Sequence, residues 1–161
     1  MTILETERLL LRRLNEKDDA EFMLELLNDL SFIQNIGDRK IRDADGAKGY
    51  IRNGPVASYA KNGFGLYLVQ LKETGESIGM CGLIKRDQLK DVDIGYAYLP
   101  RYWSKGYAIE SALAVKEYAR DVVGLKRIVA IVDPRNAGSI RVLEKLGMTF
   151  EKMVKLAADD I

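Results

Sequence analysis

The sequence predicts an α/β (α+β) fold in which helices flank a mixed, mostly antiparallel central sheet. Three strand-like runs, at 64–71, 77–84 and 92–99, follow one another with short turns between them, which is typical of an antiparallel meander. A long helical run at 105–123 then joins the third strand to an apolar run at 127–132. Such a strand–helix–strand crossover is right-handed and makes its two strands parallel, so the sheet is mixed.

The bulk composition indicates one domain spanning residues 1–161. Of these residues 47% are hydrophobic and 30% are charged, which suits a single globular core. The net charge of +1 gives no electrostatic drive for binding nucleic acid. No apolar run approaches the ~18 residues of a membrane span, and the first residues lack the basic and apolar regions of a signal peptide. We therefore expect a cytoplasmic protein without a nucleic-acid or membrane partner.

Two absences narrow the chemistry. The chain has no histidine, which removes Ser-His-Asp and Cys-His catalysis and the commonest metal ligand. The one cysteine, Cys81, excludes an internal disulfide and a multi-thiolate zinc site, and its apolar surroundings predict burial. We expect no metal site.

The N-terminal half is expected to supply one strand and two helical segments. Residues 9–14 form an apolar strand, and Asn15 is placed to cap a helix over 16–29, where apolar residues recur at helical spacing. Residues 43–62 are helical in character, but glycines and the Gly54-Pro55 pair predict a broken helix. Such a segment forms either a mobile rim of a ligand cleft or a plain irregular connection.

The C-terminal half is expected to contain two more helices and a last strand. The helix over 105–123 should stop at Gly124 and bury one apolar face, formed by Ala108, Ala112, Val115, Ala119 and Val122. A turn at 133–136 leads to a helix over 136–146, and a strand follows at 149–156.

The turn that opens the helix at 105–123 is a candidate anion site. Its residues are Ser104, Lys105, Gly106, Tyr107 and Ala108. Free N–H groups and the positive end of the helix dipole suit a diphosphate, glycine permits a positive φ, and lysine adds a charge. An ordinary helix start is the alternative, because neither a P-loop nor a Rossmann fingerprint is present.

A second candidate motif opens the next helix. Asn136 is a good helix cap. The hydroxyl of Ser139 lies in the first turn, where it either bonds to the local backbone or faces a ligand.

Together the two motifs resemble a known family. The sequences P-R-Y-W-S-K-G-Y-A-I-E-S and R-I-V-A-I-V-D-P-R-N-A-G-S-I-R-V-L-E-K-L-G-M-T-F are similar to the GNAT superfamily of acetyl-CoA-dependent N-acetyltransferases. The opening E-T-E-R-L-L-L-R-R-L resembles the branch typified by ribosomal-protein N-terminal acetyltransferases. The resemblance covers nearly the whole chain. It implies direct transfer of an acetyl group from acetyl-CoA to a primary amine, either a protein or peptide N-terminus or a small-molecule amine.

The resemblance also implies roles for residues of both motifs. Residues 104–108 would bind the pyrophosphate of coenzyme A, and the backbone near Tyr98 and Leu99 would pair with the pantetheine arm. Asn136 and Ser139 would line the opposite wall, where the neighbouring strand splays away.

Three positions depart from the family pattern. Ser104 replaces the usual glycine, and Trp103 stands where many relatives have Gln or Arg, although aromatic residues there are usual for this branch. Leu143 replaces the tyrosine that serves many relatives as general acid. Ser139 is then the one hydroxyl of this motif able to protonate the leaving thiolate.

The attacking amine must be neutral, which determines how strong a base is needed. An α-amine with a pKa near ~8 is roughly 10% neutral at pH 7, whereas a lysine is below ~0.1%. Asp93 is the first candidate base, followed by Asp91 and Glu110. Some relatives carry a catalytic acidic residue one position before Asp93. A shift of one residue changes the face of a strand, so a surface carboxylate is the alternative for Asp93. A strand N–H near Leu99 would polarise the carbonyl.

Other classes of function stay open at this point. Two departures favour a non-catalytic acyl-CoA-binding or sensing module: Leu143 lacks a hydroxyl, and Asp93 is offset by one residue from the acidic residue of relatives. A scaffold without ligand is a third hypothesis. Relatives usually have one more strand after the one expected at 149–156, so we expect the last C-terminal strand to be missing. Either the fold is trimmed, or a second subunit covers the exposed edge in a homodimer.

Overall fold

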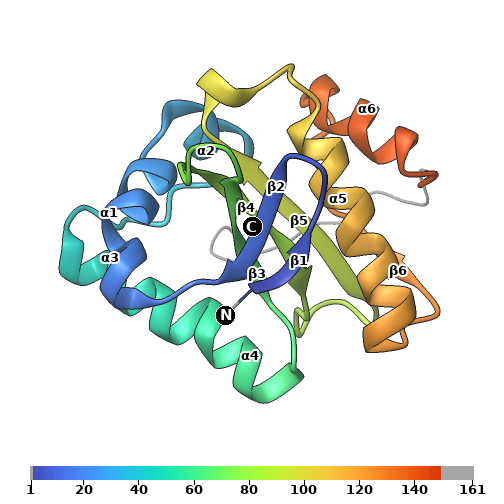
Figure 1. Ribbon diagram of the computed structural model, residues 1–161, viewed down its shortest axis with the longest axis horizontal. Helices are drawn as coiled ribbons and strands as arrows, with labels where there is room; N and C mark the ends of the chain where they lie inside the picture. Colours follow the sequence, from blue (N-terminus) through green and yellow to red (C-terminus); the bar gives the residue numbers. More distant parts are fainter. Residues whose placement is uncertain (1, 150–161) are drawn as a thin grey trace.

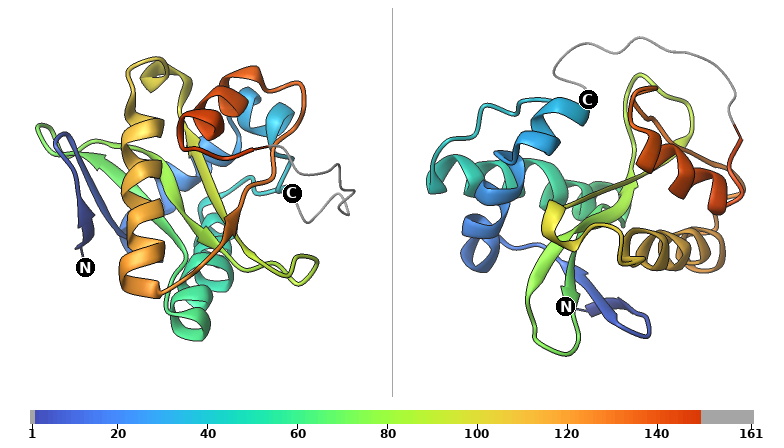
Figure 2. Two further views of the ribbon diagram at one scale, coloured as in Figure 1. Left: turned by 90° about the vertical axis from the view of Figure 1, so that its right-hand side faces the viewer. Right: turned by 90° about the horizontal axis from the view of Figure 1, so that it is seen from above.

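The computed structural model describes residues 2–149 and has a six-stranded sheet with helices on both faces (Figures 1 and 2). The strands lie side by side in sequence order: β1 (Thr2–Glu5), β2 (Leu9–Arg13), β3 (Leu66–Leu71), β4 (Ser77–Ile84), β5 (Val92–Tyr98) and β6 (Ile128–Val129). All neighbours are antiparallel except β5 and β6, which are parallel. The predicted meander, crossover and mixed sheet are confirmed.

Two helical layers cover the sheet. One face carries α1 (Glu16–Leu27), α2 (Leu30–Asn35) and α3 (Ala44–Ile51). The π turn Arg52–Val56 continues α3 into α4 (Ala57–Asn62), whose Tyr59 belongs to the core of the opposite face. The other face carries α5 (Tyr107–Tyr118), its π-helical extension Ala119–Val123, and α6 (Ala137–Lys145); a short 3₁₀ turn, Pro100–Tyr102, leads from β5 toward α5. Figure 2 shows α5 and α6 together on their side of the sheet.

Each central strand contributes to both layers, because successive side chains point to opposite faces. In β5, Val92, Ile94 and Tyr98 belong to the core under α5. Ala97 and the adjacent Leu99 belong to the core under α1–α3. This alternation fixes the direction of every side chain that β5 presents to the site described below.

The segment at 43–62 is a continuous helical run, and the predicted break is wrong. Asp43 caps its start by accepting a hydrogen bond from the N–H of Gly46, and Gly63, with a φ of 79°, ends it. Pro55 lies inside the π turn. Proline has no N–H and its ring crowds the preceding turn, and the wider turn accommodates both effects without ending the helix.

Other features differ from the expectations or lie outside the described residues. Strand β1 and helix α2 were not predicted, and β6 covers two residues rather than 127–132. Val122 is 68% exposed rather than buried, because the π turn adds a residue and rotates it off the apolar stripe. The strand expected at 149–156 falls almost wholly outside the described residues.

Cys81 is fully buried in β4, as predicted, and burial raises its pKa to about 12. Its thiol therefore stays protonated at neutral pH. Across residues 2–149, no helix is both long and apolar enough to cross a bilayer.

The close approach of β4 to β3 depends on Gly82. A Cβ at this position would lie 2.1 Å from the carbonyl oxygen of Gly65. We expect Gly82→Ala to lower the free energy of unfolding by roughly 3 kcal/mol or more, because backbone would have to move. Gly49→Ala is the matched control, since nothing lies within 4 Å of its Cβ in α3; helix propensity predicts a gain of up to about 1 kcal/mol. Urea unfolding of both variants checks this, and equal stabilities would contradict it.

Candidate active site

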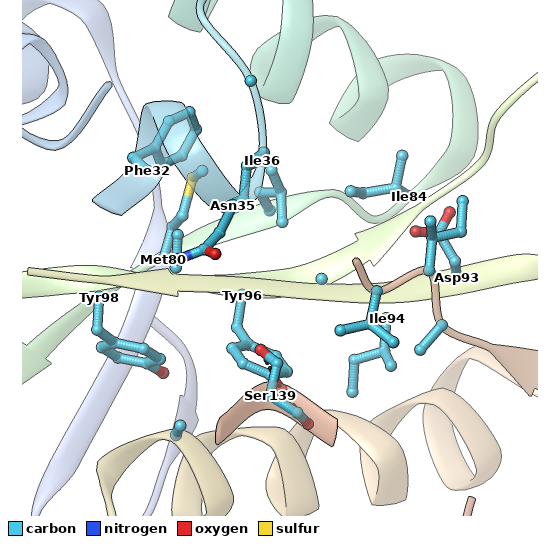
Figure 3. A pocket seen from close by; sticks show the side chains of 18 of the residues that line it. Phe32, Asn35, Ile36, Met80, Ile84, Asp93, Ile94, Tyr96, Tyr98 and Ser139 are labelled. Carbon is cyan, nitrogen blue, oxygen red and sulfur yellow. Dashed lines mark hydrogen bonds between the residues drawn. The ribbon is translucent and has the colours of Figure 1, made fainter. Parts of the chain in front are cut away.

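A cleft of about 1870 Å³ passes the edge of β5 at the place where β6 leaves the sheet. The two strands pair only at Val92 with Ile128 and Asp93 with Val129. Residues from both faces of β5 line the cleft, which therefore connects the α1–α3 side of the sheet with the α5–α6 side. Figure 3 shows Asp93 on one side of β5 and Tyr96 and Ser139 on the other.

The open edge of β5 presents backbone groups to the cleft. The N–H of Leu99 donates to the carbonyl of Ile78 on β4 at 3.1 Å. Because backbone groups alternate in direction along an antiparallel strand, those of Tyr96 and Tyr98 point away from β4, to the edge that β6 leaves open. An extended ligand could pair with the strand there.

Leu99 itself cannot take the role expected of its backbone. Its N–H is bonded to β4, and its carbonyl accepts a hydrogen bond from the N–H of Tyr102 at 2.9 Å. The ladder direction thus argues against the role expected of Leu99, and the neighbouring backbone groups at the open edge belong to Tyr96 and Tyr98. The same finding rules out the Leu99 N–H as the group that polarises a carbonyl.

Trp103 lies against this open edge. Its indole Nε1 donates to the carbonyl of Tyr98 at 2.8 Å, and the residue is 47% exposed. It is the only tryptophan in the sequence. An extended ligand on the edge of β5 would therefore come close to the indole ring.

The turn at 104–108 leads into α5 with an unusual backbone, and we call it the cradle. Ser104 and Gly106 both have positive φ angles, of 62° and 85°. The helix α5 starts at Tyr107 without a side-chain cap, and its first helical bond runs from the N–H of Glu110 to the carbonyl of Gly106 at 3.0 Å. The N–H groups of the first turn precede any helical acceptor and carry the positive end of the helix dipole. The local geometry suits an anion.

Arg8, which the sequence reasoning missed, holds the cradle from the β1–β2 turn. Its Nη1 donates to the carbonyl of Lys105 at 2.9 Å, and its Nε donates to Oε1 of Glu110 at 2.7 Å. Its guanidinium lies over the ring of Tyr107, 4.4 Å from the centroid. The motif that contains Arg8 resembles the family, but no local signal in the sequence connects it with a turn about 100 residues later.

Two of the three candidate bases are engaged elsewhere. Burial opposes the ionisation of Glu110, but hydrogen bonds from Thr6 and Arg8 outweigh it and lower its pKa. Asp91 is paired with Arg127 at 3.0 Å. Neither carboxylate lines the cleft, so the structure favours neither as a base.

Asp93 is buried rather than a surface carboxylate, and it lines the cleft. It is 1% exposed, with Nε of Arg86 lying 3.3 Å from Oδ1 and 3.4 Å from Oδ2. Burial raises its pKa to about 6, although Arg86 acts in the opposite direction. A carboxylate with this pKa is ionised at neutral pH and is a stronger base than an ordinary aspartate.

The second motif caps α6 and places a hydroxyl at the cleft. Oδ1 of Asn136 accepts a hydrogen bond from the N–H of Ser139 at 3.2 Å, which confirms the expected cap. The hydroxyl of Tyr96 donates to Oγ of Ser139, also at 3.2 Å. Sequence reasoning missed Tyr96, although strand alternation places it on the same face as Tyr98.

The comparison with protein families identifies the family to which this chain belongs. The model of the acetyltransferase (GNAT) domain matches residues 8–149. The chain belongs to the GNAT acetyltransferase family. This membership confirms the predicted family and the predicted enzyme class, an acetyltransferase dependent on acetyl-CoA.

Relatives and solved structures agree with this assignment. The uncharacterized protein YkkB of Bacillus subtilis (strain 168) is 31% identical, with 96% of this chain and 89% of that protein covered. The uncharacterized N-acetyltransferase p20 of Bacillus licheniformis is also 31% identical, with 96% and 86% covered. An acetyltransferase from Agrobacterium tumefaciens str. C58 superposes with a TM-score of 0.82 at 26% identity, covering 99% of this chain and 90% of that one. This superposition confirms the fold class.

Proposed function

We propose that this GNAT protein transfers the acetyl group of acetyl-CoA directly to a primary amine, with the α-amine of a protein or peptide as the favoured acceptor. The observation that carries the proposal is the position of Asp93. A buried carboxylate with a raised pKa lies directly beside the point where β5 and β6 separate. The same cleft contains the anion cradle and the hydroxyl of Ser139.

The α5–α6 side and the β5 edge suit the donor. Residues 104–108 would hold the pyrophosphate through free N–H groups, with the charges of Lys105 and Arg8 nearby. The pantetheine amides would pair with the backbone groups of Tyr96 and with the N–H of Tyr98, whose carbonyl is bonded to Trp103, and Asn136 and Ser139 would form the facing wall. The short β6 leaves this edge open.

Trp103 should report donor binding, because its indole lies at the carbonyl of Tyr98. We expect coenzyme A to change the intensity and wavelength of tryptophan emission, toward the blue if the ligand covers the ring. Pyrophosphate alone is the matched ligand control, because it can occupy the cradle without reaching the strand edge. Calorimetric binding of coenzyme A with unchanged emission would contradict a pantetheine track beside Trp103.

The acceptor would approach from the α1–α3 side, where Phe32, Asn35, Ile36 and Met80 line the cleft (Figure 3). Its neutral nitrogen attacks the thioester carbonyl, and a tetrahedral intermediate forms. Asp93 accepts a proton from that nitrogen, the carbon–sulfur bond breaks, and Ser139 donates a hydrogen bond to the departing thiolate. Open-edge N–H groups of β5 would polarise the carbonyl oxygen.

An α-amine is favoured over a lysine for a physical reason. About one α-amine in ten is neutral at pH 7, against fewer than about one lysine in a thousand. An α-amine therefore demands less proton removal by Asp93 than a lysine would. Structures named ribosomal-protein acetyltransferases share the fold, among them the ribosomal-protein-S5-alanine acetyltransferase of Vibrio fischeri, with a TM-score of 0.74 at 21% identity over 91% of this chain and 82% of that one.

A panel of amines tests the proposal. Peptides with free N-termini, the same peptides with blocked N-termini and one lysine, polyamines and aminoglycosides are incubated with acetyl-CoA, and free thiol is followed. We expect turnover with free N-termini and none with blocked peptides. Binding of acetyl-CoA without turnover on any amine would instead favour a non-catalytic acyl-CoA-binding module. The apolar Leu143, at the position of the general-acid tyrosine of many relatives, is the observation that favours this alternative.

A further inference from the structure

The hydroxyls of Tyr96 on β5 and Ser139 on α6 meet across the cleft (Figure 3). The phenol of Tyr96 lies 3.2 Å from Oγ of Ser139 and 3.2 Å from its backbone carbonyl oxygen. The residues are separated by 43 positions in the sequence. The contact therefore joins the strand that forms the open edge to the helix that forms the facing wall.

The direction of this hydrogen bond determines what the serine can do. Tyr96 is the donor to both oxygens, so its one phenolic hydrogen is shared between them. The hydrogen of the Ser139 hydroxyl is then not used in the pair. Among residues 2–149 the structure shows no acceptor for it, and Ser139 lines the cleft. The serine O–H is left to donate to a ligand there.

Tyr96 is well suited to a fixed donor role. Its ring packs against the core under α5 and lies 6.5 Å from the ring of Tyr98, at an interplanar angle of 39°. Burial raises the pKa of Tyr96, so the phenol keeps its hydrogen throughout the neutral range. Leu143, one helical turn after Ser139 on the same face of α6, is apolar and also lines the cleft. The hydroxyl beside Ser139 is therefore supplied by Tyr96 on β5 and not by position 143 on α6.

We propose that Tyr96 is a positioning residue, which fixes the Ser139 hydroxyl so that its hydrogen points at the sulfur of the leaving coenzyme A. The inference rests on the proposed acetyl transfer, since it concerns the thiolate that this reaction releases. The side chain of Tyr96 keeps its own proton and forms no bond to substrate. Its hydrogen bond also polarises the serine O–H, because hydrogen bonds in a chain strengthen one another.

A titration of bound coenzyme A tests this role without any acceptor amine. The thiol is titrated by its ultraviolet thiolate absorbance in the wild type, Tyr96→Phe, Ser139→Ala and the double variant. A hydrogen bond to the thiolate lowers the thiol pKa. We expect Tyr96→Phe and Ser139→Ala each to raise it by about one pH unit relative to the wild type, and the double variant to match Ser139→Ala.

Turnover gives a second readout on the same variants. Tyr96→Phe should lower kcat by about tenfold with KM for acetyl-CoA changed less than twofold, and should have no added effect once Ser139 is alanine. Tyr118→Phe is the control for loss of a core hydroxyl; Tyr118 lies on α5 against Tyr67 and does not line the cleft. Its kcat and bound-thiol pKa should equal those of the wild type.

Two results would overturn the role of Tyr96. One is a bound-thiol pKa that is the same in the wild type and in Tyr96→Phe. The other is a double variant whose pKa shift is the sum of the two single shifts, which would mean that the hydroxyls act separately. Absence of turnover in the wild type would contradict the proposed function instead. The thiol titration needs no turnover, so it would still decide whether Tyr96 acts through Ser139.

Discussion

Asp93→Asn should lower kcat by about 100-fold or more while leaving the Kd of coenzyme A within about twofold. Asparagine keeps the shape of the side chain but cannot accept a proton, and positioned general bases contribute about 10²- to 10⁴-fold. Asp93 lies on the opposite face of β5 from Ser139, so the donor contacts should survive (Figure 3). Steady-state thiol release and calorimetry on the same preparations measure the two effects. Equal losses of kcat and of coenzyme A affinity would contradict a role confined to proton transfer.

The pH dependence gives an independent check on the base. The pKa of Asp93 is raised to about 6, so the group is ionised above that pH and protonated below it. The wild-type kcat should therefore fall about tenfold per pH unit below pH 6, and the residual kcat of Asp93→Asn should lack this limb. Asp91→Asn is the matched control, because Asp91 is a nearby carboxylate paired with Arg127 outside the cleft.

The stability of Asp93→Asn separates lost chemistry from lost folding. A carboxyl whose folded pKa lies above its usual 3.8 favours the folded state only when protonated, so the charged form costs stability as pH rises through about 6. The shift of about two units corresponds to at most about 3 kcal/mol. Asp93→Asn should thus be at least as stable as the wild type at pH 7.5, and the difference should vanish below pH 4. Lower stability of the variant at pH 7.5 would show that the contact with Arg86 outweighs the burial.

Gly106→Val should weaken coenzyme A binding by about 10- to 100-fold. Gly106 has a φ of 85°, where a β-branched residue is strained, and its new Cβ would lie 3.2 Å from Nη2 of Arg8. Relief of that strain would rotate the N–H groups of the first turn of α5 away from the anion. Calorimetry with coenzyme A measures the loss.

Gly75→Val is the matched control for backbone strain. Gly75 has a φ of 78° in the β3–β4 turn and an open space around it, so the strain is similar but lies outside the cleft. Both variants should lose about 1–2 kcal/mol of stability, and only Gly106→Val should lose affinity. Similar affinity losses in both would mean that strain acts through the whole fold rather than through the cradle.

The parts of the site that follow from local sequence were predictable. The turn Ser104–Ala108 precedes an apolar helical run, and glycine at 106 signals the positive φ that the structure has. The cap of α6 was predictable because asparagine favours the N-cap position and Asn136 directly precedes that helix. The meander and the crossover were also predictable, because each joins elements that are neighbours in the sequence. Their short turns and their periodic apolar residues can be seen in the sequence itself.

The parts that were missed depend on contacts between distant segments. Arg8 reaches Glu110 across 102 positions, and Tyr96 reaches Ser139 across 43. The burial of Asp93, which is 1% exposed beside Arg86, depends on the assembled tertiary structure, and the residue pattern of the strand alone does not indicate it. The π turn at Arg52–Val56 likewise depends on packing that keeps a proline inside a helix.

Single-turnover transfer of a labelled acetyl group tests the central claim most directly. Excess wild-type protein is mixed with labelled acetyl-CoA and a peptide with a free N-terminus, and the label on the peptide nitrogen is followed together with released thiol. We predict that label and thiol appear in equal amounts and at equal rates, and that Asp93→Asn slows both by about 100-fold or more. Tight binding of acetyl-CoA with no labelled amine, or a transfer rate unchanged in Asp93→Asn, would contradict the account.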